Sequence, residues 1–405
     1  MNIDKETRFE EHIKASRLAS HGSCLRAVLI RAAVVGWALC ANAALPKYEV
    51  LRGSIPRSEY GDITRYSVRS ETLKSDVIVD IWTPKGYDPS SMKRYPVVYA
   101  HDGQNLFDSS FSFAGVAWEV DKACIELSSD TDFDMPIIVG INNRGAEGLR
   151  PNDYFPENAL DNISDSDRDK TFIFQTCNDL FLGNEEAGFV ADELKPLVDS
   201  LYNTAPGMAT TFAMGSSMGA LASMYLLCEY PEKFGGAACL STHWIGSLNL
   251  NSDYSMNDDE ICANAILQYL SDNLPHDGIH RLYMDQGTED WDAGYRKYEV
   301  IAREIVEDKG YTRENGLLYV YDAKGAGHNE WYWQQRVKIP LKFLLSKTAI
   351  KKIEEESDLN DVAVNRKETE DSGMIYDVKG NSYSPSALES LPEGIYIQDG
   401  KKIKR

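Results

Sequence analysis

Apolar residues in the middle of this chain form short continuous runs that alternate with longer amphipathic segments. A short run of β-branched and other apolar residues is typical of a buried strand in a parallel sheet. Segments of helix formers with apolar residues at helical spacing, such as 220–227, predict helices between the strands. This alternation indicates an α/β fold. The runs that predict strands are 95–100, 210–214, 236–240, 280–285 and 317–321.

The junction between the strand 210–214 and the following helix carries the most informative motif, Gly215-Ser216-Ser217-Met218-Gly219. A strand that turns sharply into a helix strains its central residue and leaves room only for small neighbours two positions away. The turn lifts the Ser217 hydroxyl out of the sheet, in front of a helix N-terminus that favours developing negative charge. This pattern predicts the nucleophile elbow of an α/β-hydrolase, whose mostly parallel central sheet has helices on both faces.

A serine nucleophile needs a base, and in this fold the histidine follows the serine along the chain. His328 lies in a glycine-rich loop directly after the strand 317–321, so we predict that it is the general base. His243 follows another strand and has two open interpretations, a pocket residue or a hydrogen-bonded loop residue. His276 and His280 have the i, i+4 spacing of a metal pair, but a proline and a glycine nearby indicate a turn. We therefore expect no metal site.

The histidine in turn needs a carboxylate that holds its tautomer. Four acidic residues crowd the end of the strand 280–285 and the loop after it, at the sheet edge where α/β proteins gather ligand groups. Asp290 stands on the first turn beyond the strand and is the predicted acid. Glu289 is the second choice, and Asp285 and Asp292 rank behind it.

Two backbone N–H groups should stabilise the oxyanion of the tetrahedral intermediate. One belongs to the residue after the nucleophile, which is Met218. The other belongs to the loop after an early strand. The strand 95–100 runs into a loop where Gly103 lets the backbone approach a substrate, so the Gln104 amide is the predicted second donor.

Three separated motifs follow one another along the chain: His101-Asp102-Gly103-Gln104-Asn105-Leu106-Phe107-Asp108, the elbow, and His328-x-Glu330-x-x-Trp333-x-x-Arg336. Together they resemble the putative esterase family of α/β-hydrolases, which includes esterase D, the enterochelin esterases, the antigen 85 mycolyltransferases, and feruloyl and acetylxylan esterases. Weaker similarities lie at 79–87, 139–156 and 189–198. The resemblance covers residues 62 to 346.

The resemblance implies a serine esterase that needs no cofactor and no metal. It maps the catalytic triad to Ser217, Asp290 and His328, and the oxyanion donors to Gln104 and Met218.

The acidic stretch from Glu157 to Phe181 has no obvious counterpart in the family, and we expect it to form a lid or rim over the site. We predict that Trp244, Tyr154 and His243 line the substrate pocket. For the other aromatic residues near the catalytic loops, stacking on a substrate and burial both stay open: Trp118, Trp291 and Trp331.

Composition narrows the choice of partner. The chain has 405 residues, of which 43% are hydrophobic, enough for one large core. Its net charge of −21 would repel a phosphate backbone, which excludes nucleic acid and suits an ester that is neutral or attached to a neutral polysaccharide. The seven cysteines are widely spaced, and the sequence leaves open whether two of them form a disulfide.

Both ends differ from the esterase domain predicted at 46–347. Residues 1–43 combine arginines, a short apolar run and Ala41-Asn42-Ala43, which predicts a cleaved secretory signal, with an uncleaved anchor as the rival. Residues 348–373 are charged and predict a linker. Residues 374–405 predict a short β tail that resembles the end of type IX sorting domains. A β-ribbon docked on the catalytic domain is the alternative.

These observations predict a secreted or periplasmic serine esterase without stable membrane insertion, acting on acetyl or feruloyl esters of plant polysaccharide through an acyl-enzyme. A siderophore esterase or an acyltransferase would share the same motifs. A non-catalytic glycan-binding protein is the alternative from another class. The sequence does not determine the oligomeric state.

Overall fold

The computed structural model describes residues 45–357, 375–377, 382–383, 395–398 and 401–404. The chain divides into two compact units on either side of the Leu345–Ser346 boundary. The predicted signal, residues 1–43, lies outside the described residues. None of the described helices is both long enough and apolar enough to cross a membrane.

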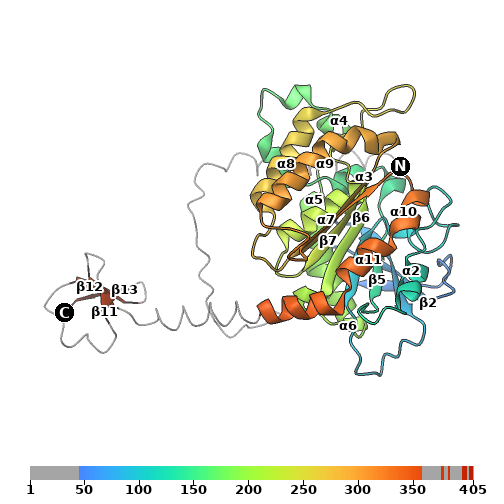
Figure 1. The fold of residues 1–405 in the computed structure, drawn as a ribbon, viewed down its shortest axis with the longest axis horizontal. Helices are drawn as coiled ribbons and strands as arrows, with labels where there is room; N and C mark the ends of the chain where they lie inside the picture. Colours follow the sequence, from blue (N-terminus) through green and yellow to red (C-terminus); the bar gives the residue numbers. More distant parts are fainter. Residues whose placement is uncertain (1–44, 358–374, 378–381, 384–394, 399–400, 405) are drawn as a thin grey trace, which may run out of the picture. The chain divides into compact units, whose positions relative to one another are not determined.

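Within the described residues, a nine-stranded mixed sheet forms the centre of the first unit (Figure 1). Its order is β1-β2-β3-β5-β4-β6-β7-β8-β9. Pairs from β1 to β5 along this order are antiparallel, and pairs from β5 to β9 are parallel. The predicted α/β fold with a mostly parallel sheet is therefore confirmed. The strands are β1 (Tyr48–Leu51), β2 (Gly61–Arg69), β3 (Asp76–Pro84), β4 (Val97–His101), β5 (Ile137–Ile141), β6 (Thr211–Ser216), β7 (Gly236–Leu240), β8 (Arg281–Gly287) and β9 (Leu318–Ala323).

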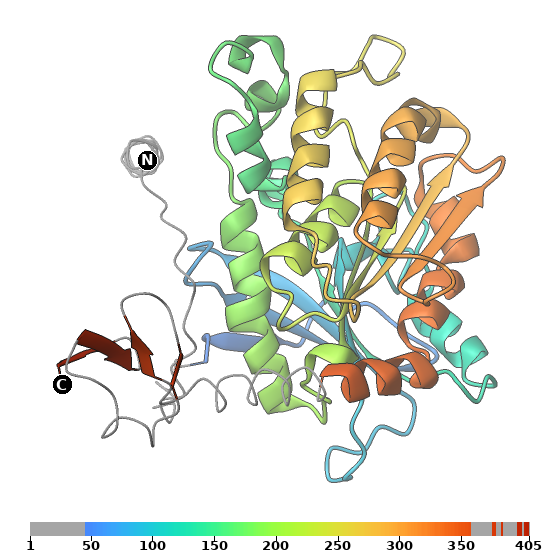
Figure 2. The ribbon, with the colours of Figure 1, turned by 60° about the vertical axis from the view of Figure 1, so that its left-hand side comes forward.

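Helices cover both faces of this sheet. Figures 1 and 2 show α5, α7, α8 and α9 on one face, and α2 packed with α11 on the other. The described α-helices of this unit are α2 (Val120–Leu127), α3 (Arg150–Tyr154), α4 (Ile173–Thr176), α5 (Gly183–Gly188), α6 (Lys195–Leu201), α7 (Met218–Glu229), α8 (Glu260–Asn273), α9 (Asp290–Asp308), α10 (Glu330–Arg336) and α11 (Lys338–Leu344). A π-helical segment, η5 (Phe189–Leu194), joins α5 to α6.

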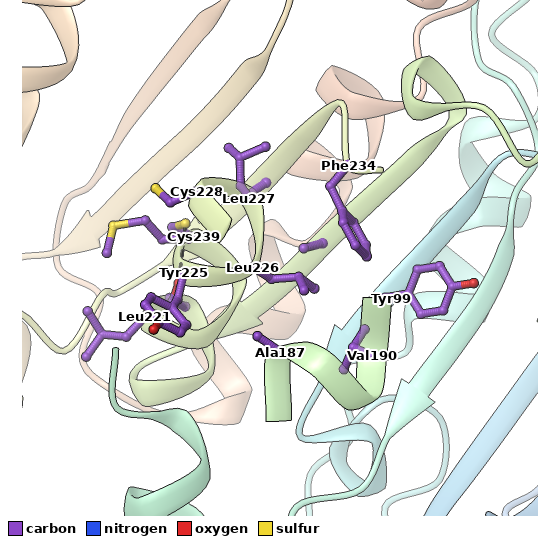
Figure 3. Packing of buried hydrophobic residues seen from close by; sticks show 14 of the residues in the cluster. Tyr99, Ala187, Val190, Leu221, Tyr225, Leu226, Leu227, Cys228, Phe234 and Cys239 are labelled. Atoms are coloured by element: carbon purple, nitrogen blue, oxygen red, sulfur yellow. Dashed lines mark hydrogen bonds between the residues drawn. The ribbon is translucent and has the colours of Figure 1, made fainter. Parts of the chain in front are cut away.

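The core lies between the sheet and the helix α7, which is buried on every side from Met218 to Cys228. Apolar side chains all round a helix are expected where it is enclosed by other elements. Figure 3 shows side chains of α7 packed with those of neighbouring elements, and the rings of Tyr99 and Phe234 meet edge to face at 5.8 Å. The helix that follows the elbow is thus fixed by packing.

The acidic insertion 157–181 packs against α8. Its Thr171 hydroxyl and Phe172 amide both donate to one carboxylate oxygen of Asp259, at 2.9 and 2.7 Å. Near its end, the Thr176 hydroxyl accepts a hydrogen bond from the Leu248 amide at 2.9 Å, and Leu248 packs beside Met218. The insertion is therefore connected to the elbow through Leu248.

Within the described residues the five cysteines 124, 177, 228, 239 and 262 are buried free thiols. Residues 347–357, which include the first part of the predicted linker 348–373, form a helix with ion pairs Lys351–Glu355 and Lys352–Glu356 at 3.5 and 3.8 Å. Oppositely charged residues four positions apart support a helix. The rest of that linker lies outside the described residues.

The second unit also contains a small antiparallel sheet of order β11-β10-β12-β13. Its strands fall in the segment predicted as a β tail: β10 (Ile375–Asp377), β11 (Ser382–Tyr383), β12 (Ile395–Gln398) and β13 (Lys401–Lys404).

Candidate active site

Ser217 stands at the strained turn between β6 and α7, with φ 56° and ψ −124°. Its amide donates to the Leu240 carbonyl at 2.9 Å, which ties the turn to β7. A Cβ at Gly215 would lie 2.2 Å from the Gly219 carbonyl oxygen, and one at Gly219 would lie 3.0 Å from the Asp102 carboxylate. A larger residue at Gly215 would force the backbone apart, and one at Gly219 would press on the side chains of Asp102 and His101, so both positions of the elbow favour glycine.

The imidazole of His328 contacts the nucleophile. Its Nε2 lies 2.8 Å from Oγ of Ser217, and its side chain is 5% exposed. The rings of Tyr295 and Trp333 meet the imidazole edge to face, at 5.5 and 5.1 Å between centroids. Packing from α9 and α10 therefore holds the imidazole in the plane that reaches the serine.

The carboxylate that contacts His328 is Asp292, and not Asp290 as predicted. Oδ1 of Asp292 lies 2.5 Å from Nδ1 of His328. Asp290 is exposed at the first position of α9, at φ 53°. Its carboxylate lies against Gly327, where an added Cβ would come within 1.9 Å of Oδ2. Asp290 thus borders the histidine loop without reaching the imidazole.

The helical period of α9 contains the signal that would have identified Asp292. The buried positions of this helix include Tyr295, Glu299 and Ala302, and Asp292 is three residues before Tyr295 on the same face. Residues three or four apart on a helix share a face. Asp290 does not lie on this buried face. Extending the pattern of buried positions toward the N-terminus of α9 therefore selects Asp292.

Asp292 is an ionised hydrogen-bond acceptor. Its Oδ2 accepts from the Ser241 hydroxyl and from the Gly287 amide, each at 2.6 Å. Burial alone would raise the pKa of Asp292, but the hydrogen bond and charge of His328, with the bonds from Ser241 and Gly287, outweigh it and lower the pKa. Because an ionised carboxylate only accepts, Nδ1 of His328 carries the proton and Nε2 is free to accept from Ser217.

Met218 and Gln104, the predicted oxyanion donors, both stand at the starts of helical turns. Met218 is the first residue of α7, where an amide has no acceptor within the helix. Gln104 lies in the 3₁₀ turn η1 (Gly103–Asn105) after β4. A Cβ at Gly103 would lie 2.3 Å from the Gly140 carbonyl carbon, so only glycine lets this loop pass so close to β5.

Asp102 holds the Gln104 loop in place. Arg150 donates to both carboxylate oxygens of Asp102, at 2.8 and 2.6 Å, and the Asp102 amide donates to the Tyr154 hydroxyl at 3.0 Å. Burial would raise the pKa of Asp102, but the charge and hydrogen bonds of Arg150 lower it. This ion pair supports the loop without contacting the serine.

The predicted pocket residues are instead packed inside the protein. Trp244 is 1% exposed and donates from Nε1 to Glu299 at 2.6 Å. His243 is 1% exposed; it accepts from the Tyr295 hydroxyl at 2.6 Å and donates to the Ser247 carbonyl at 3.1 Å. Tyr154 is 2% exposed and packs beside Met218. These burials correct the pocket prediction, and the partly exposed aromatic ring nearest the imidazole is Trp291, at 5.4 Å.

His280 is engaged by protein groups and does not form a metal pair with His276. Nδ1 of His280 lies 2.8 Å from the Asp277 carboxylate, and Nε2 lies 2.8 Å from the Pro231 carbonyl. Both ring nitrogens therefore have protein partners. In the part of the chain that the structure describes, no three His, Cys, Asp or Glu side chains gather as metal ligands.

The family model described as "Putative esterase" matches residues 70–342, about two thirds of the chain. The chain belongs to this esterase family. The predicted family is confirmed, and the protein is an esterase that hydrolyses carboxylic esters.

Relatives of known sequence and structure resemble this esterase over most of their length. Two proteins of Bacillus subtilis (strain 168), described as uncharacterized proteins YjcH and YbbA, are each 24% identical to it. These alignments cover 70% and 66% of this chain and 98% and 92% of the relatives. Two solved structures share the fold at a TM-score of 0.50 each. The first is a ferulic acid esterase that is 15% identical to this chain. The alignment covers 72% of this chain and 99% of the ferulic acid esterase. The second is an IroE-like serine hydrolase from Shewanella oneidensis that is 18% identical to this chain. The alignment covers 71% of this chain and 80% of the hydrolase.

Proposed function

We propose that this esterase cleaves its substrate through an acyl-enzyme, with Ser217 as nucleophile, His328 as general base and Asp292 as the orienting acid. The observation that carries this proposal is the unbroken chain of contacts from Ser217 Oγ to His328 Nε2 at 2.8 Å and from His328 Nδ1 to Asp292 at 2.5 Å. Three side chains that follow three separate strands have the mutual geometry that activates a serine.

The reaction begins when Nε2 of His328 takes the hydroxyl proton as Oγ of Ser217 attacks the ester carbonyl carbon. The amides of Met218 and Gln104 stabilise the oxyanion of the tetrahedral intermediate. His328 then returns the proton to the alkoxy oxygen, the carbon–oxygen bond breaks and the alcohol leaves. Water then attacks the acyl-enzyme while His328 takes its proton; the bond from the acyl carbon to Oγ of Ser217 breaks, His328 returns the proton to Oγ, and the carboxylic acid leaves. Asp292 stabilises the imidazolium throughout and does not take the proton.

The substrate class that we propose is a phenolic acyl ester, of the feruloyl type, on a neutral plant polysaccharide. Trp291, next to the imidazole, donates from Nε1 to the Tyr254 carbonyl at 2.8 Å, and the Tyr254 side chain is 76% exposed. The Trp291 ring beside the imidazole suits an aromatic acyl group, because offset rings attract beyond their buried area. An acetyl group would not use this ring. A ferric catecholate siderophore is anionic, which the protein's net charge of −21 disfavours.

We also propose that the enzyme works outside the cytoplasm. The support is the sequence pattern of residues 1–43, in which an apolar run after two arginines ends at Ala41-Asn42-Ala43.

A comparison of kcat/KM on p-nitrophenyl acetate, methyl ferulate, acetylated xylan and a ferric catecholate siderophore tests the substrate class. We expect methyl ferulate to be the best substrate. Trp291→Ala should lower kcat/KM for methyl ferulate by about tenfold, the size of one lost aromatic contact, and that for the acetate much less. Trp331→Ala is the matched control, because Trp331 is 53% exposed and its ring packs on Tyr332. Faster turnover of acetylated xylan or the siderophore, or equal losses on both ester types, would refute the phenolic assignment.

A further inference from the structure

Ser241, directly after β7, connects the acid of the site to a buried arginine. Its Oγ lies 2.6 Å from Oδ2 of Asp292, 3.0 Å from Nε1 of Trp333 and 2.7 Å from Nη2 of Arg336. Ser241, Arg336 and Asp292 are 0, 4 and 0% exposed, so bulk water does not compete for these hydrogen bonds.

The chemistry of these groups fixes the direction of each hydrogen bond. An indole N–H and a guanidinium N–H can only donate, and a hydroxyl has a single hydrogen. Trp333 and Arg336 therefore occupy the acceptor sites of Ser241, and its hydrogen is left for Asp292. A hydroxyl free of such neighbours would be able to rotate away from the carboxylate.

The arginine is itself held by a second carboxylate. Nε and Nη2 of Arg336 donate to the two oxygens of Asp285, at 2.9 and 3.0 Å. Asp285 also accepts from the Tyr283 hydroxyl at 2.8 Å. Burial opposes the charge of Arg336, but the charge and hydrogen bonds of Asp285 outweigh burial and raise the pKa of Arg336, so the guanidinium stays charged.

We propose that Ser241 is a positioning residue for the triad, and that Trp333 and Arg336 lock its hydroxyl onto Asp292. This inference rests on the proposed function of Ser217, His328 and Asp292. Oδ2 of the carboxylate is then fixed by Ser241 and the Gly287 amide, so that Oδ1 points at Nδ1 of His328. The hydrogen bond from Ser241 thus sets the angle between the Asp292 carboxylate and the His328 imidazole.

Ser241→Ala is the direct test. We expect kcat to fall about 10- to 100-fold, as for the loss of a hydrogen bond to a charged group, with KM little changed. The far-downfield proton resonance of the His328–Asp292 hydrogen bond should shift or broaden. Ser241→Thr keeps the hydroxyl and should recover kcat above that of Ser241→Ala, although a β-branched residue is strained at φ 45°.

A second pair of variants separates positioning from general stability. Arg65 and Asp80 form another buried ion pair with two contacts of 2.7 Å, on the antiparallel side of the sheet. Arg336→Lys and Arg65→Lys each replace a planar guanidinium, which donates two hydrogen bonds to one carboxylate, by an ammonium that cannot reproduce this geometry. We therefore expect both variants to have a lower Tm. Only Arg336→Lys should lower kcat.

The proposal is overturned if Ser241→Ala keeps the wild-type kcat and resonance, or if the two arginine variants lose kcat equally. Ser217→Ala in the same assay keeps these outcomes distinct from a failure of the proposed function. If Ser217→Ala retains turnover, the triad is wrong. If it is inactive while Ser241→Ala is fully active, only the positioning role is wrong.

Discussion

Asp292 and His328 are joined at 2.5 Å between the carboxylate Oδ1 and the imidazole Nδ1, and the other imidazole nitrogen lies 2.8 Å from Ser217. The three residues follow β8, β9 and β6, strands that run parallel in one sheet. Parallel strands bring their carboxyl ends to a single edge, which is why side chains 111 residues apart meet there.

Replacing the two neighbouring aspartates by asparagine should have opposite outcomes. Asp292→Asn keeps the shape but favours the wrong imidazole tautomer, so we expect kcat to fall about 10,000-fold. Asp290→Asn should leave kcat close to that of the wild type, because Asp290 is exposed and asparagine tolerates its positive φ. Steady-state kinetics on one ester gives both values. A large loss in Asp290→Asn with little loss in Asp292→Asn would reverse the assignment.

The loop after β8 shows what the sequence determines and what it does not. The elbow and the histidine loop were predictable because each depends on a local strand, turn and helix pattern. The choice among carboxylates depends on where α9 begins, and a shift of two residues changes which side chain turns inward. The prediction for Trp244 is wrong because its partner Glu299 lies 55 residues away on α9, and the sequence of the loop around Trp244 does not reveal such a contact.

Gly287→Ala should damage both stability and activity. An added Cβ would lie 2.2 Å from the Ala326 carbonyl oxygen and 2.6 Å from Oδ2 of Asp292, so the backbone or the acid must move. We expect a loss of about 1–3 kcal/mol in the free energy of unfolding and a lower kcat. Gly294→Ala is the matched control on α9, where the added Cβ meets no atom within 4 Å. It should stabilise the protein by up to about 1 kcal/mol. Wild-type stability and kcat in Gly287→Ala would contradict the packing of this loop.

Burial of His243 makes stability depend on pH. Desolvation lowers its pKa from 6.5 to about 3; the charges of His328 and Arg150 add to this, and the hydrogen bond to the Ser247 carbonyl opposes it. Between these two values the unfolded chain binds a proton that the folded protein does not, so stability falls as the pH falls below 6.5. Above pH 6.5 His243 is neutral in both the folded and the unfolded state. It then adds no pH dependence to the free energy of unfolding.

Chemical unfolding of the wild type and of His243→Gln between about pH 4 and 6.5 measures this contribution. We expect the wild type to lose up to about 1.4 kcal/mol per pH unit more than the variant. Parallel curves for the two proteins would show that His243 takes up a proton in the folded state.

Labelling with a fluorophosphonate probe, followed by peptide mass spectrometry, tests the central claim most directly. We expect a single phosphonylated residue, Ser217, loss of ester turnover in step with labelling, and neither labelling nor turnover in Ser217→Ala. An unlabelled protein that still hydrolyses esters, or a Ser217→Ala variant with wild-type turnover, would contradict the account.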